Sequence, residues 1–164
     1  MKKIKLSQGQ YALIDNEDFE RVNQFKWYAI WQEGLNGFYA VRTDYTFGKH
    51  QTIYMHREIM NTPDGLQCDH INRETLDNRR VNLRNCTVAQ NTMNRSLNSN
   101  NTSGYMGVTK FRRKWQARIR KGGKAVYARY FDTALEAAIA RDQAAIQHYG
   151  EFANLNFQVE KEKK

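Results

Sequence analysis

The sequence contains few cysteines and no long apolar stretch. Only two of its 164 residues are cysteine, Cys68 and Cys86. Two are too few for a disulfide scaffold, and they lack the paired spacing of a zinc site. We therefore expect both to be small buried side chains, reduced in a cytoplasmic compartment. No apolar run approaches the roughly 18 residues of a membrane-spanning helix, and the first residues lack the apolar segment of a signal peptide, so no membrane partner is expected.

Acidic side chains are missing from the middle of the chain. Between Asn78 and Phe131 there is no Asp or Glu, whereas thirteen Lys or Arg residues occur there. The whole chain carries a net charge of +9, with 26% charged and 40% apolar residues, which is typical of a soluble folded protein with a polyanionic partner. A block of one sign is either a disordered basic tail or a folded nucleic-acid-binding face. The aromatic residues and turn signals inside this block favour the folded face.

The first third of the chain is rich in strand signals. Tyr11–Ile14 is a strand candidate, and Asp15 is expected to cap a short amphipathic helix. Three further segments, Lys26–Trp31, Phe38–Thr43 and Thr52–Met55, are rich in aromatic and β-branched residues and are separated by glycine turns. No catalytic set is evident here. The aromatic residues are expected to form a small core, namely Trp27, Tyr28, Trp31, Phe38 and Tyr39.

The stretch that follows contains several polar residues whose side chains could take part in catalysis. Asp69 and His70 end a short apolar run, a polar loop leads to Asn82, and a second strand-like piece precedes a helix that contains Asn91. Two strands, a long loop and a helix would fold the carboxylate, the imidazole and the last amide toward one another. His56 is a rival functional histidine, but it lacks a carboxylate neighbour and is expected to be structural or to contact phosphate.

This constellation suits phosphodiester hydrolysis. A neutral imidazole such as His70 is an appropriate general base near neutral pH. Mg²⁺ takes few protein oxygens and retains waters or substrate oxygens, which Asp69 and the amide of Asn91 would satisfy. Asn82 is placed to hold the loop through its backbone and so to fix His70. On spacing alone, an ordinary surface Asp-His pair with asparagines in turns is an equally good interpretation.

The stretch resembles the ββα-metal motif of HNH endonucleases, in particular the phage homing endonucleases. In that family an Asp-His pair ends the first strand, an Asn-Leu pair follows thirteen residues after the Asp, and a helix Asn or His lies nine further on, as Asp69, His70, Asn82 and Asn91 do. The resemblance implies a metal ligand, a general base, a loop-orienting amide and a second metal ligand, respectively. An Asn in place of the frequent His favours Mg²⁺ or Mn²⁺ over Zn²⁺, and Asn94 is the alternative ligand.

A second module is expected after a polar segment at 95–104, whose Asn and Ser residues are typical of a linker. Three strands follow, with a hairpin signal at Gly122-Gly123. Thr133 opens a capping box, and the helix after it should end at Gly150. Its many alanines allow close packing against the sheet.

Charged residues on this predicted sheet point to a binding face. Along the second strand apolar and polar residues alternate, so one face packs while the other presents Arg118 and Arg120. On the third strand Tyr127 and Arg129 are expected to lie beside them on that outward face. Such a face can enter a major groove, and the alternative is a solvated basic sheet without sequence preference.

The second module resembles the plant ethylene-response-factor (AP-two) DNA-binding domain. The match is carried by residues 107–108, 115–120, 131–133, 136–138, 141–142, 144–145 and 153–157. The resemblance implies that the sheet lies in the major groove of duplex DNA and reads bases. The residues expected to contact DNA are Arg112, Arg113, Lys114, Trp115, Arg118, Arg120, Lys124, Tyr127 and Arg129.

The sequence thus predicts an α+β protein. A β-rich region at 1–55 leads into a ββα-metal nuclease motif at 56–94, then come the linker at 95–104, a three-stranded antiparallel sheet packed on one helix at 105–157, and a charged tail at 158–164. We expect a site-specific DNA endonuclease of the homing type, with one Mg²⁺ (or Mn²⁺), no small-molecule cofactor beyond the metal, double-stranded DNA as partner and a monomeric or weakly dimeric state in the cytoplasm of a bacterial host. The alternatives are a catalytically silent DNA-binding transcription regulator and, more weakly, RNA binding through the same face.

Overall fold

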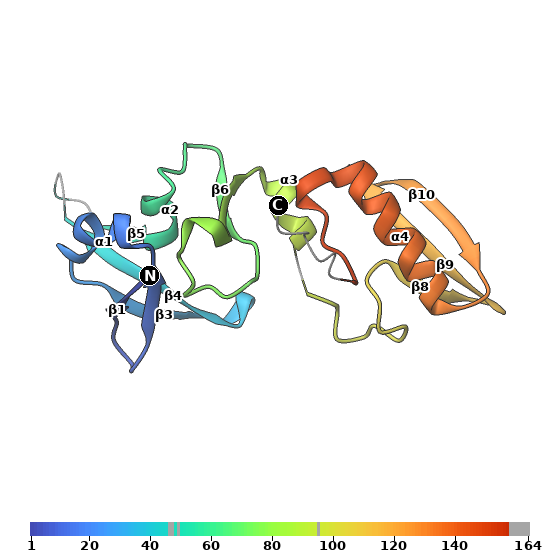
Figure 1. The fold of residues 1–164 in the computed structure, drawn as a ribbon, viewed down its shortest axis with the longest axis horizontal. Helices are drawn as coiled ribbons and strands as arrows, with labels where there is room; N and C mark the ends of the chain where they lie inside the picture. Colours follow the sequence, from blue (N-terminus) through green and yellow to red (C-terminus); the bar gives the residue numbers. More distant parts are fainter. Residues whose placement is uncertain (46–47, 49, 95, 158–164) are drawn as a thin grey trace. The chain divides into compact units, whose positions relative to one another are not determined.

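The computed structural model describes residues 1–45, 48, 50–94 and 96–157 (Figure 1). The mixture of small antiparallel sheets and helices confirms the predicted α+β class. The chain divides into two compact units, Met1–Val88 and a second that begins at Ala89. The predicted charged tail at 158–164 lies outside the described residues. Within the described part of the chain, no helix is long and apolar enough to cross a membrane.

The first unit contains the predicted strands of the β-rich region and those of the nuclease motif. Its regular elements are β1 (Lys2–Lys5), β2 (Tyr11–Ile14), α1 (Asn16–Asn23), β3 (Tyr28–Gln32), a 3₁₀ turn at Glu33–Leu35, β4 (Gly37–Asp44), β5 (Gln51–Tyr54), α2 (Met55–Ile59), β6 (Gln67–His70), a 3₁₀ turn at Arg80–Asn82 and β7 (Leu83–Cys86). The strands pair antiparallel as β1-β2, β3-β4-β5 and β6-β7. Asp69 and His70 are the last two residues of β6, as the sequence predicts.

One hydrophobic core serves the whole of this unit. Its buried members come from β1, β2, α1, β3, β4, α2, β6 and β7 and include Ile4, Leu6, Ala12, Ile14, Val22, Trp27, Ala29, Ala40, Met55, Ile59, Cys68 and Leu83. The β-rich region and the nuclease strands are therefore packed together. The connection is also made by the backbone, because Leu13 N donates to Leu76 O at 2.8 Å and Asn78 N donates to Leu13 O at 2.8 Å.

The predicted aromatic core is only partly correct. Trp27 is buried, and its indole N–H donates to Val22 O at 2.8 Å. Trp31, in contrast, is 50% exposed and rests edge-on against Phe38 at the surface. Tyr39 lies beside two histidine rings instead of in the centre of the core. Alternation places Trp31 on the same face of β3 as the buried Ala29, but Trp31 lies near the end of the strand, opposite Phe38, and is left half exposed there.

The boundary between the units falls within a short helical segment, α3 (Val88–Asn91), which is followed in the second unit by a 3₁₀ turn at Thr92–Asn94. Between this turn and the sheet, the described residues contain no helix or strand. The last residues of the predicted linker are nevertheless bonded to the sheet, because Ser103 Oγ donates to Val108 O at 2.8 Å. Asn101 Nδ2 donates to the carbonyl of Tyr105, just before the sheet, at 3.0 Å.

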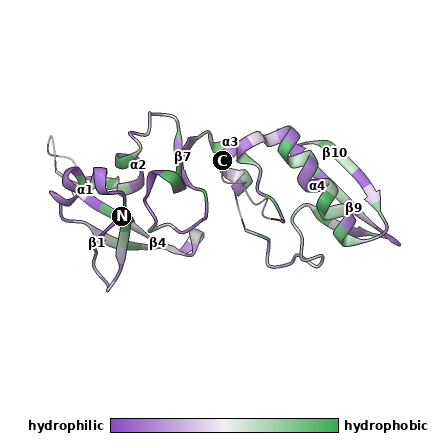
Figure 2. Ribbon diagram, viewed as in Figure 1, coloured by the Kyte–Doolittle hydropathy of each residue, from purple (hydrophilic) through white to green (hydrophobic). Residues whose placement is uncertain are grey.

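The rest of the second unit is the predicted three-stranded sheet and its helix. Its elements are β8 (Val108–Phe111), β9 (Lys114–Lys121), β10 (Lys124–Phe131), α4 (Ala134–Tyr149) and a 3₁₀ turn at Gly150–Phe152. The antiparallel order is β10-β9-β8, and α4 lies across one face of the sheet (Figure 1). Hydrophobic and hydrophilic residues are interspersed along α4 (Figure 2). The apolar side packs alanines against the sheet, where Val108, Ala117, Ile119, Ala137, Ala138, Ala144 and Ala145 are buried.

The helix caps and the hairpin turn of this unit lie where the sequence predicts them. Thr133 accepts a hydrogen bond from Glu136 N at 3.2 Å while the Glu136 carboxylate accepts from Thr133 N at 3.1 Å, so the capping box is present. Gly150 is the C-cap of α4. Gly122 and Gly123 have φ of 58° and 77°, the positive values that a tight hairpin turn requires.

Gly107 permits a close approach between the start of the sheet and α4. Its φ is +71°, and a Cβ built there would lie 2.9 Å from Arg118 O and 3.0 Å from Arg141 Nε. Arg141 is 5% exposed and donates to Asp142 and to the carbonyl of Asn154. A side chain at position 107 would therefore meet a backbone atom and a buried guanidinium.

Candidate active site and DNA-binding face

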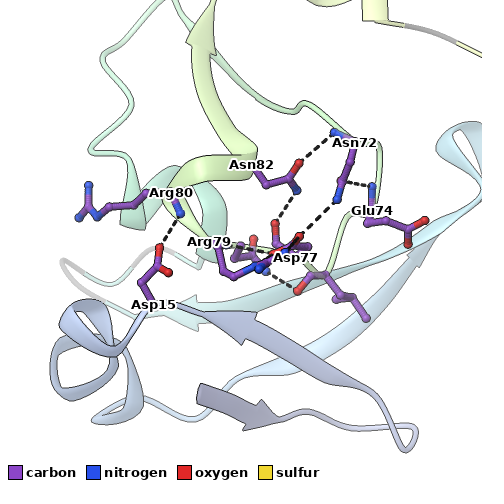
Figure 3. Close-up of polar contacts among 9 residues, drawn as sticks. Asp15, Asn72, Glu74, Asp77, Arg79, Arg80 and Asn82 are labelled. Atoms are coloured by element: carbon purple, nitrogen blue, oxygen red, sulfur yellow. Dashed lines mark hydrogen bonds and ion pairs between the residues drawn. The ribbon is translucent and has the colours of Figure 1, made fainter. Parts of the chain in front are cut away.

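Asn82 braces the loop between β6 and β7. Its Oδ1 accepts from Asn72 N at 2.9 Å, and its Nδ2 donates to Asp77 O at 2.8 Å (Figure 3). The side chain is 6% exposed. One amide thus joins the two arms of the loop through their backbone, which is the kind of contact that its position in the sequence predicts.

Asp77 is the centre of a second set of contacts in the same loop. Its carboxylate accepts from Arg79 Nε and Nη2 at 2.7 Å each and from Asn72 Nδ2 at 3.2 Å (Figure 3). Hydrogen bonding from Arg79 lowers the pKa of Asp77 despite the opposing effect of burial. The carboxylate is therefore ionised at neutral pH and keeps the loop closed.

The loop is also attached to α1. Arg80 N donates to the carboxylate of Asp15 at 2.8 Å (Figure 3), and the Arg80 guanidinium makes two 2.8 Å contacts to Asp18. Asp15 occupies the predicted N-cap position, but its side chain makes no capping hydrogen bond because it is directed to Arg80. Asp18 is 3% exposed and also accepts from Arg21 at 2.7 Å. Burial raises its pKa, but the hydrogen bonds from Arg80 and Arg21 outweigh this effect and lower it.

His70 lies under this braced loop and is 4% exposed. Its ring centroid is 4.9 Å from that of His56 and 6.0 Å from that of Tyr39. Its Nε2 is 3.2 Å from Asn78 Oδ1. Burial lowers the pKa of His70, and the contact with Asn78 and the negative charges of Asp69 and Asp77 oppose that effect only in part. The imidazole is consequently neutral at neutral pH, the form that can accept a proton.

The rival histidine, His56, is buried beside it. Burial, followed by the proximity of His70 and Arg57, lowers the pKa of His56 to about 3. Its ring also contacts Tyr39 and Tyr54 at centroid distances of 5.6 and 5.5 Å. A buried neutral ring packed on aromatic neighbours fits the structural role that the sequence suggests, and a phosphate contact stays a prediction.

Asp69 lies next to His70 in sequence and faces Arg84 across the β6–β7 pair. Its Oδ2 accepts from Arg84 Nη2 at 2.8 Å and from Nε at 3.0 Å. The structure thus gathers Asp69, His70 and Asn82 around one strand end. Asn91, the last residue of α3, belongs to the second unit, so its pairing with Asp69 in a metal site stays a prediction. The same holds for Asn94, which is buried in the following turn.

Two neighbours of this site were missed by the sequence analysis. Arg84 is opposite Asp69 because the strands pair in that register, and Asn78 reaches His70 because the loop folds back along β2. The available signal was the residue count from the strand end, since an antiparallel pair with His70 opposite Leu83 places Asp69 opposite Arg84. No comparable signal identified Asn78.

The side chains around Asp69 bear on which metal ion the site could take. Among the described residues there is no group of three or more His, Cys, Asp or Glu side chains that could hold a metal ion. Both cysteines are buried free thiols, as expected, and burial raises the pKa of Cys68 to about 11. A carboxylate such as that of Asp69 is a ligand type that Mg²⁺ or Mn²⁺ binds while it retains several waters, and the choice of ion stays a prediction.

The outward face of the second unit differs from the predicted one. Arg118 and Arg120 are exposed on the side of β9 away from α4, as expected. The pairing of β10 shifts between Ala125, opposite Arg120, and Tyr127, opposite Ile119. Val126 is therefore the extra residue of a β-bulge, and every later side chain changes face.

Two residues that were expected on the outward face consequently lie on the other face, and their contact with DNA stays a prediction. Tyr127 and Arg129 lie opposite Ile119 and Ala117, on the face that carries α4. Tyr127 packs against the core there, and Arg129 is exposed on the edge strand with its guanidinium 5.9 Å from the Tyr127 ring. Trp115 also packs against the helix-side core and is not on the outward face.

The bulge brings a different aromatic residue to the outward face. Tyr130 lies opposite Gln116, whose Nε2 donates to the Tyr130 hydroxyl at 2.8 Å. The Phe111 ring is 5.4 Å from the Tyr130 ring, and both are about half exposed. These two rings line an apolar pocket together with three predicted contact residues, Arg112 and Arg113 of the β8–β9 turn and Lys114 at the start of β9. Lys124, the first residue of β10, is exposed.

Comparison with known proteins identifies the first unit's motif. Residues 48–93 match the model of a family described as HNH endonuclease. The chain is 30% identical over 152 residues to an uncharacterized HNH endonuclease of Acanthamoeba polyphaga mimivirus, and the alignment covers 90% of this chain and 75% of that protein. The chain belongs to the HNH endonuclease family. Membership makes it a nuclease of a family that generally uses a divalent metal.

The C-terminal part of this HNH endonuclease is similar to AP2-like proteins, so both predicted resemblances are confirmed. It is 47% identical over 60 residues to APETALA2-like protein 2 of Oryza sativa subsp. indica, covering 35% of this chain and 14% of that protein. It is 45% identical over 60 residues to an AP2-like ethylene-responsive transcription factor of Arabidopsis thaliana, covering 35% of this chain and 12% of that protein. No solved structure matches the chain.

Proposed function

We propose that this HNH endonuclease hydrolyses duplex DNA at specific sites, with His70 as the general base. The proposal rests on one observation above all: His70 is held buried and neutral at the end of β6, next to Asp69, under a loop braced by Asn82. A neutral imidazole fixed at that position accepts the proton of an attacking water. Activity of the homing type, in which a phage or bacterial enzyme cuts one site, fits this combination of cutting and reading modules.

Each residue of the site has a separate task. Asp69 and the amide oxygen of Asn91 would hold a Mg²⁺ or Mn²⁺ ion. When bound, that cation supplies electrostatic stabilisation for the pentacoordinate phosphate and the leaving 3′ oxygen. His70 moves the proton, and Asn82 keeps the loop above His70 in place through its bonds to Asn72 N and Asp77 O.

The outward face of the sheet in the second unit would locate the DNA site. Arg118 and Arg120 provide exposed positive charge there, and the β8–β9 turn adds Arg112, Arg113 and Lys114. The basic and aromatic character of this face suits groove binding by a strand reader, and similarity to AP2-like transcription factors supports duplex DNA as the partner. Lys114 pairs with Asp132 at 2.7 Å, but both side chains are largely exposed, so that contact exchanges readily for phosphate.

Cleavage of plasmid DNA by the full chain tests the assignment of His70. His70→Ala should lower the single-turnover cutting rate by about 10²–10⁴-fold, the usual contribution of a general base, with DNA binding in EDTA nearly unchanged. His148→Ala, a change on α4, is the matched control and should cut normally. Full cutting by His70→Ala would refute the assignment.

The same assay separates a nuclease from a silent DNA-binding regulator. An active enzyme converts supercoiled plasmid only when Mg²⁺ or Mn²⁺ is added, whereas a regulator leaves it intact under both conditions. One catalytic set in each chain favours nicked circles as the first product of a monomer. Sequencing of ends cut from a random DNA pool would then give the target site.

A further inference from the structure

Asn78 is the most deeply buried polar side chain near His70. It is 1% exposed, and its backbone N–H is bound to Leu13 O at 2.8 Å. Its side-chain Nδ2 donates to Leu76 O at 3.2 Å, and its Oδ1 lies 3.2 Å from His70 Nε2. The amide therefore has its two ends on different partners, inside a loop that is itself held against β2.

These contacts decide which ring nitrogen of His70 carries a proton. A backbone carbonyl only accepts hydrogen bonds, so the NH₂ end of Asn78 must face Leu76. The amide oxygen then faces His70, and because this oxygen only accepts, the Nε2 atom must donate. We propose that Asn78 is a positioning residue that sets the tautomer of His70, with the proton on Nε2 and the basic lone pair on Nδ1. Nδ1 is then the atom that receives the proton of water.

A neutral amide is well suited to this task. It orients the ring and selects its tautomer without adding a negative charge, which would favour the protonated imidazolium that cannot act as a base. The role differs from that of Asn82, which bonds to the backbone of Asn72 and Asp77 and shapes the loop. Through Leu13, the orientation of Asn78 is also tied to strand β2, outside the nuclease motif itself.

The catalytic part of this inference rests on the proposed function, whereas the tautomer does not. Ring-nitrogen NMR of the histidine-labelled full chain measures the tautomer directly, and the His70 signals are assigned by their loss in His70→Ala. The wild-type protein should show a protonated Nε2. A wild-type ring protonated on Nδ1 would overturn the proposal, whether or not a variant at Asn78 folds.

Substitution of Asn78 tests the effect of the tautomer on DNA cutting. Asn78→Ala should shift His70 toward a mixture of tautomers and lower the single-turnover cutting rate by about 10–100-fold, taking as a guide the hydrogen-bond partners that orient metal-bound histidines, with DNA binding retained. The matched control is Asn85→Ala on β7, whose amide bonds to Thr62 and Met60 O and which should keep both the tautomer and the rate. An Asn78→Ala protein that keeps the wild-type tautomer overturns the proposal.

A conservative variant helps to separate the role of Asn78 in setting the tautomer from the role of His70 in cutting. Asn78→Asp keeps an acceptor oxygen opposite Nε2, so Nε2 should stay protonated, either in the neutral ring or in the imidazolium that the added carboxylate favours. A folded variant whose ring is protonated on Nδ1 alone counts against the proposal. If His70→Ala still cuts DNA, the function assigned to His70 fails while an Nε2-protonated ring still supports Asn78 as the residue that orients it.

Discussion

The carboxylate of Asp69 is bound by the guanidinium of Arg84 from the neighbouring strand. Asp69 Oδ2 lies 2.8 Å from Arg84 Nη2, and the two side chains are 9% and 14% exposed. The acid that we propose as a metal ligand is therefore already neutralised by a cation of the protein. A divalent ion at this carboxylate would share it with Arg84 or take its place, so the two positive charges are thermodynamically coupled.

This coupling predicts how Mg²⁺ changes stability. Arg84→Ala leaves the buried Asp69 without its cation and should lower the free energy of unfolding by about 1–3 kcal/mol. Millimolar Mg²⁺ should restore more of the melting temperature in this variant than it adds to the wild type, because a ligand that binds only the folded state stabilises it. Thermal unfolding with and without Mg²⁺ measures the difference.

A second ion pair supplies the control. Arg42 and Glu58 are 3.0 Å apart and each 16% exposed, in the same unit. Arg42→Ala should be destabilising without any particular recovery in Mg²⁺. Equal recovery of both variants would show that Mg²⁺ does not act at Asp69.

Asp18 should make stability depend on acid pH. Its pKa is lowered from 3.8, since the hydrogen bonds from Arg80 and Arg21 outweigh the opposing effect of burial. A group with a depressed folded pKa contributes stability above its unfolded pKa, and the contribution is lost as the pH falls through that value toward the folded pKa. Asp18→Asn should therefore cost about 1–3 kcal/mol above roughly pH 5, with a difference from wild type that shrinks below roughly pH 4.

Urea unfolding at a series of pH values tests this dependence. Glu20→Gln is a suitable comparison. The Glu20 side chain is 88% exposed, its carboxylate lies as far as 3.8 Å from Lys2 Nζ, and exposed ion pairs contribute little to stability. A difference between wild type and Asp18→Asn that stays constant down to pH values well below 4 would contradict the assigned pKa direction.

The bulge at Val126 predicts that the two faces of the sheet bind DNA differently. Arg118→Ala removes a charge from the outward face and should reduce the slope of log affinity against log salt by about 0.9, one phosphate contact. Arg129→Ala removes the same charge from the helix-side face and should change the slope less. Fluorescence anisotropy of the full chain with duplex DNA in EDTA measures both, and a larger effect of Arg129→Ala would place the DNA on the other face.

Substitution of Gly107 and Gly123 by alanine distinguishes the cost of backbone strain from the cost of a steric clash. Both have positive φ, +71° and +77°, but a Cβ at Gly107 meets Arg118 O at 2.9 Å whereas nothing lies within 4 Å of one at Gly123. Gly123→Ala should cost only the backbone term of about 1–2 kcal/mol, and Gly107→Ala should lose about 1–3 kcal/mol more from the clash. Fluorine NMR of labelled Trp115 during urea unfolding reports on the second unit, and equal losses would contradict the clash.

The local elements were predictable because their signals are local. The Asp69–His70 strand end, the Gly122–Gly123 turn and the Thr133 capping box each depend on a few adjacent residues, and all are present. The predicted face of Tyr127 was wrong because it depends on a signal that is not local. A regular hairpin would pair it with Arg118, but one inserted residue in β10 changes the face of everything after it, and no residue type announces that insertion.

The candidate site was predictable only in part. The resemblance to the nuclease motif points to Asp69, His70 and Asn82, whereas the contacts of Asn78 and Arg84 depend on how the loop folds back and how two strands are aligned. Asp15 shows the competition directly: its sequence position is that of a helix cap, but tertiary structure uses its carboxylate for Arg80 N.

The common core of β1 to β7 limits how the cutting module can be moved between proteins. A transplant that starts at His56, where the recognisable motif begins, would leave Cys68 and Leu83 without Ile14, Val22 and Trp27 as packing partners. It would also remove Leu13, which holds Asn78 in place. A chimera with a different DNA-binding domain should therefore include the whole first unit from Met1 onward. That unit is about twice as long as the segment that matches the nuclease family.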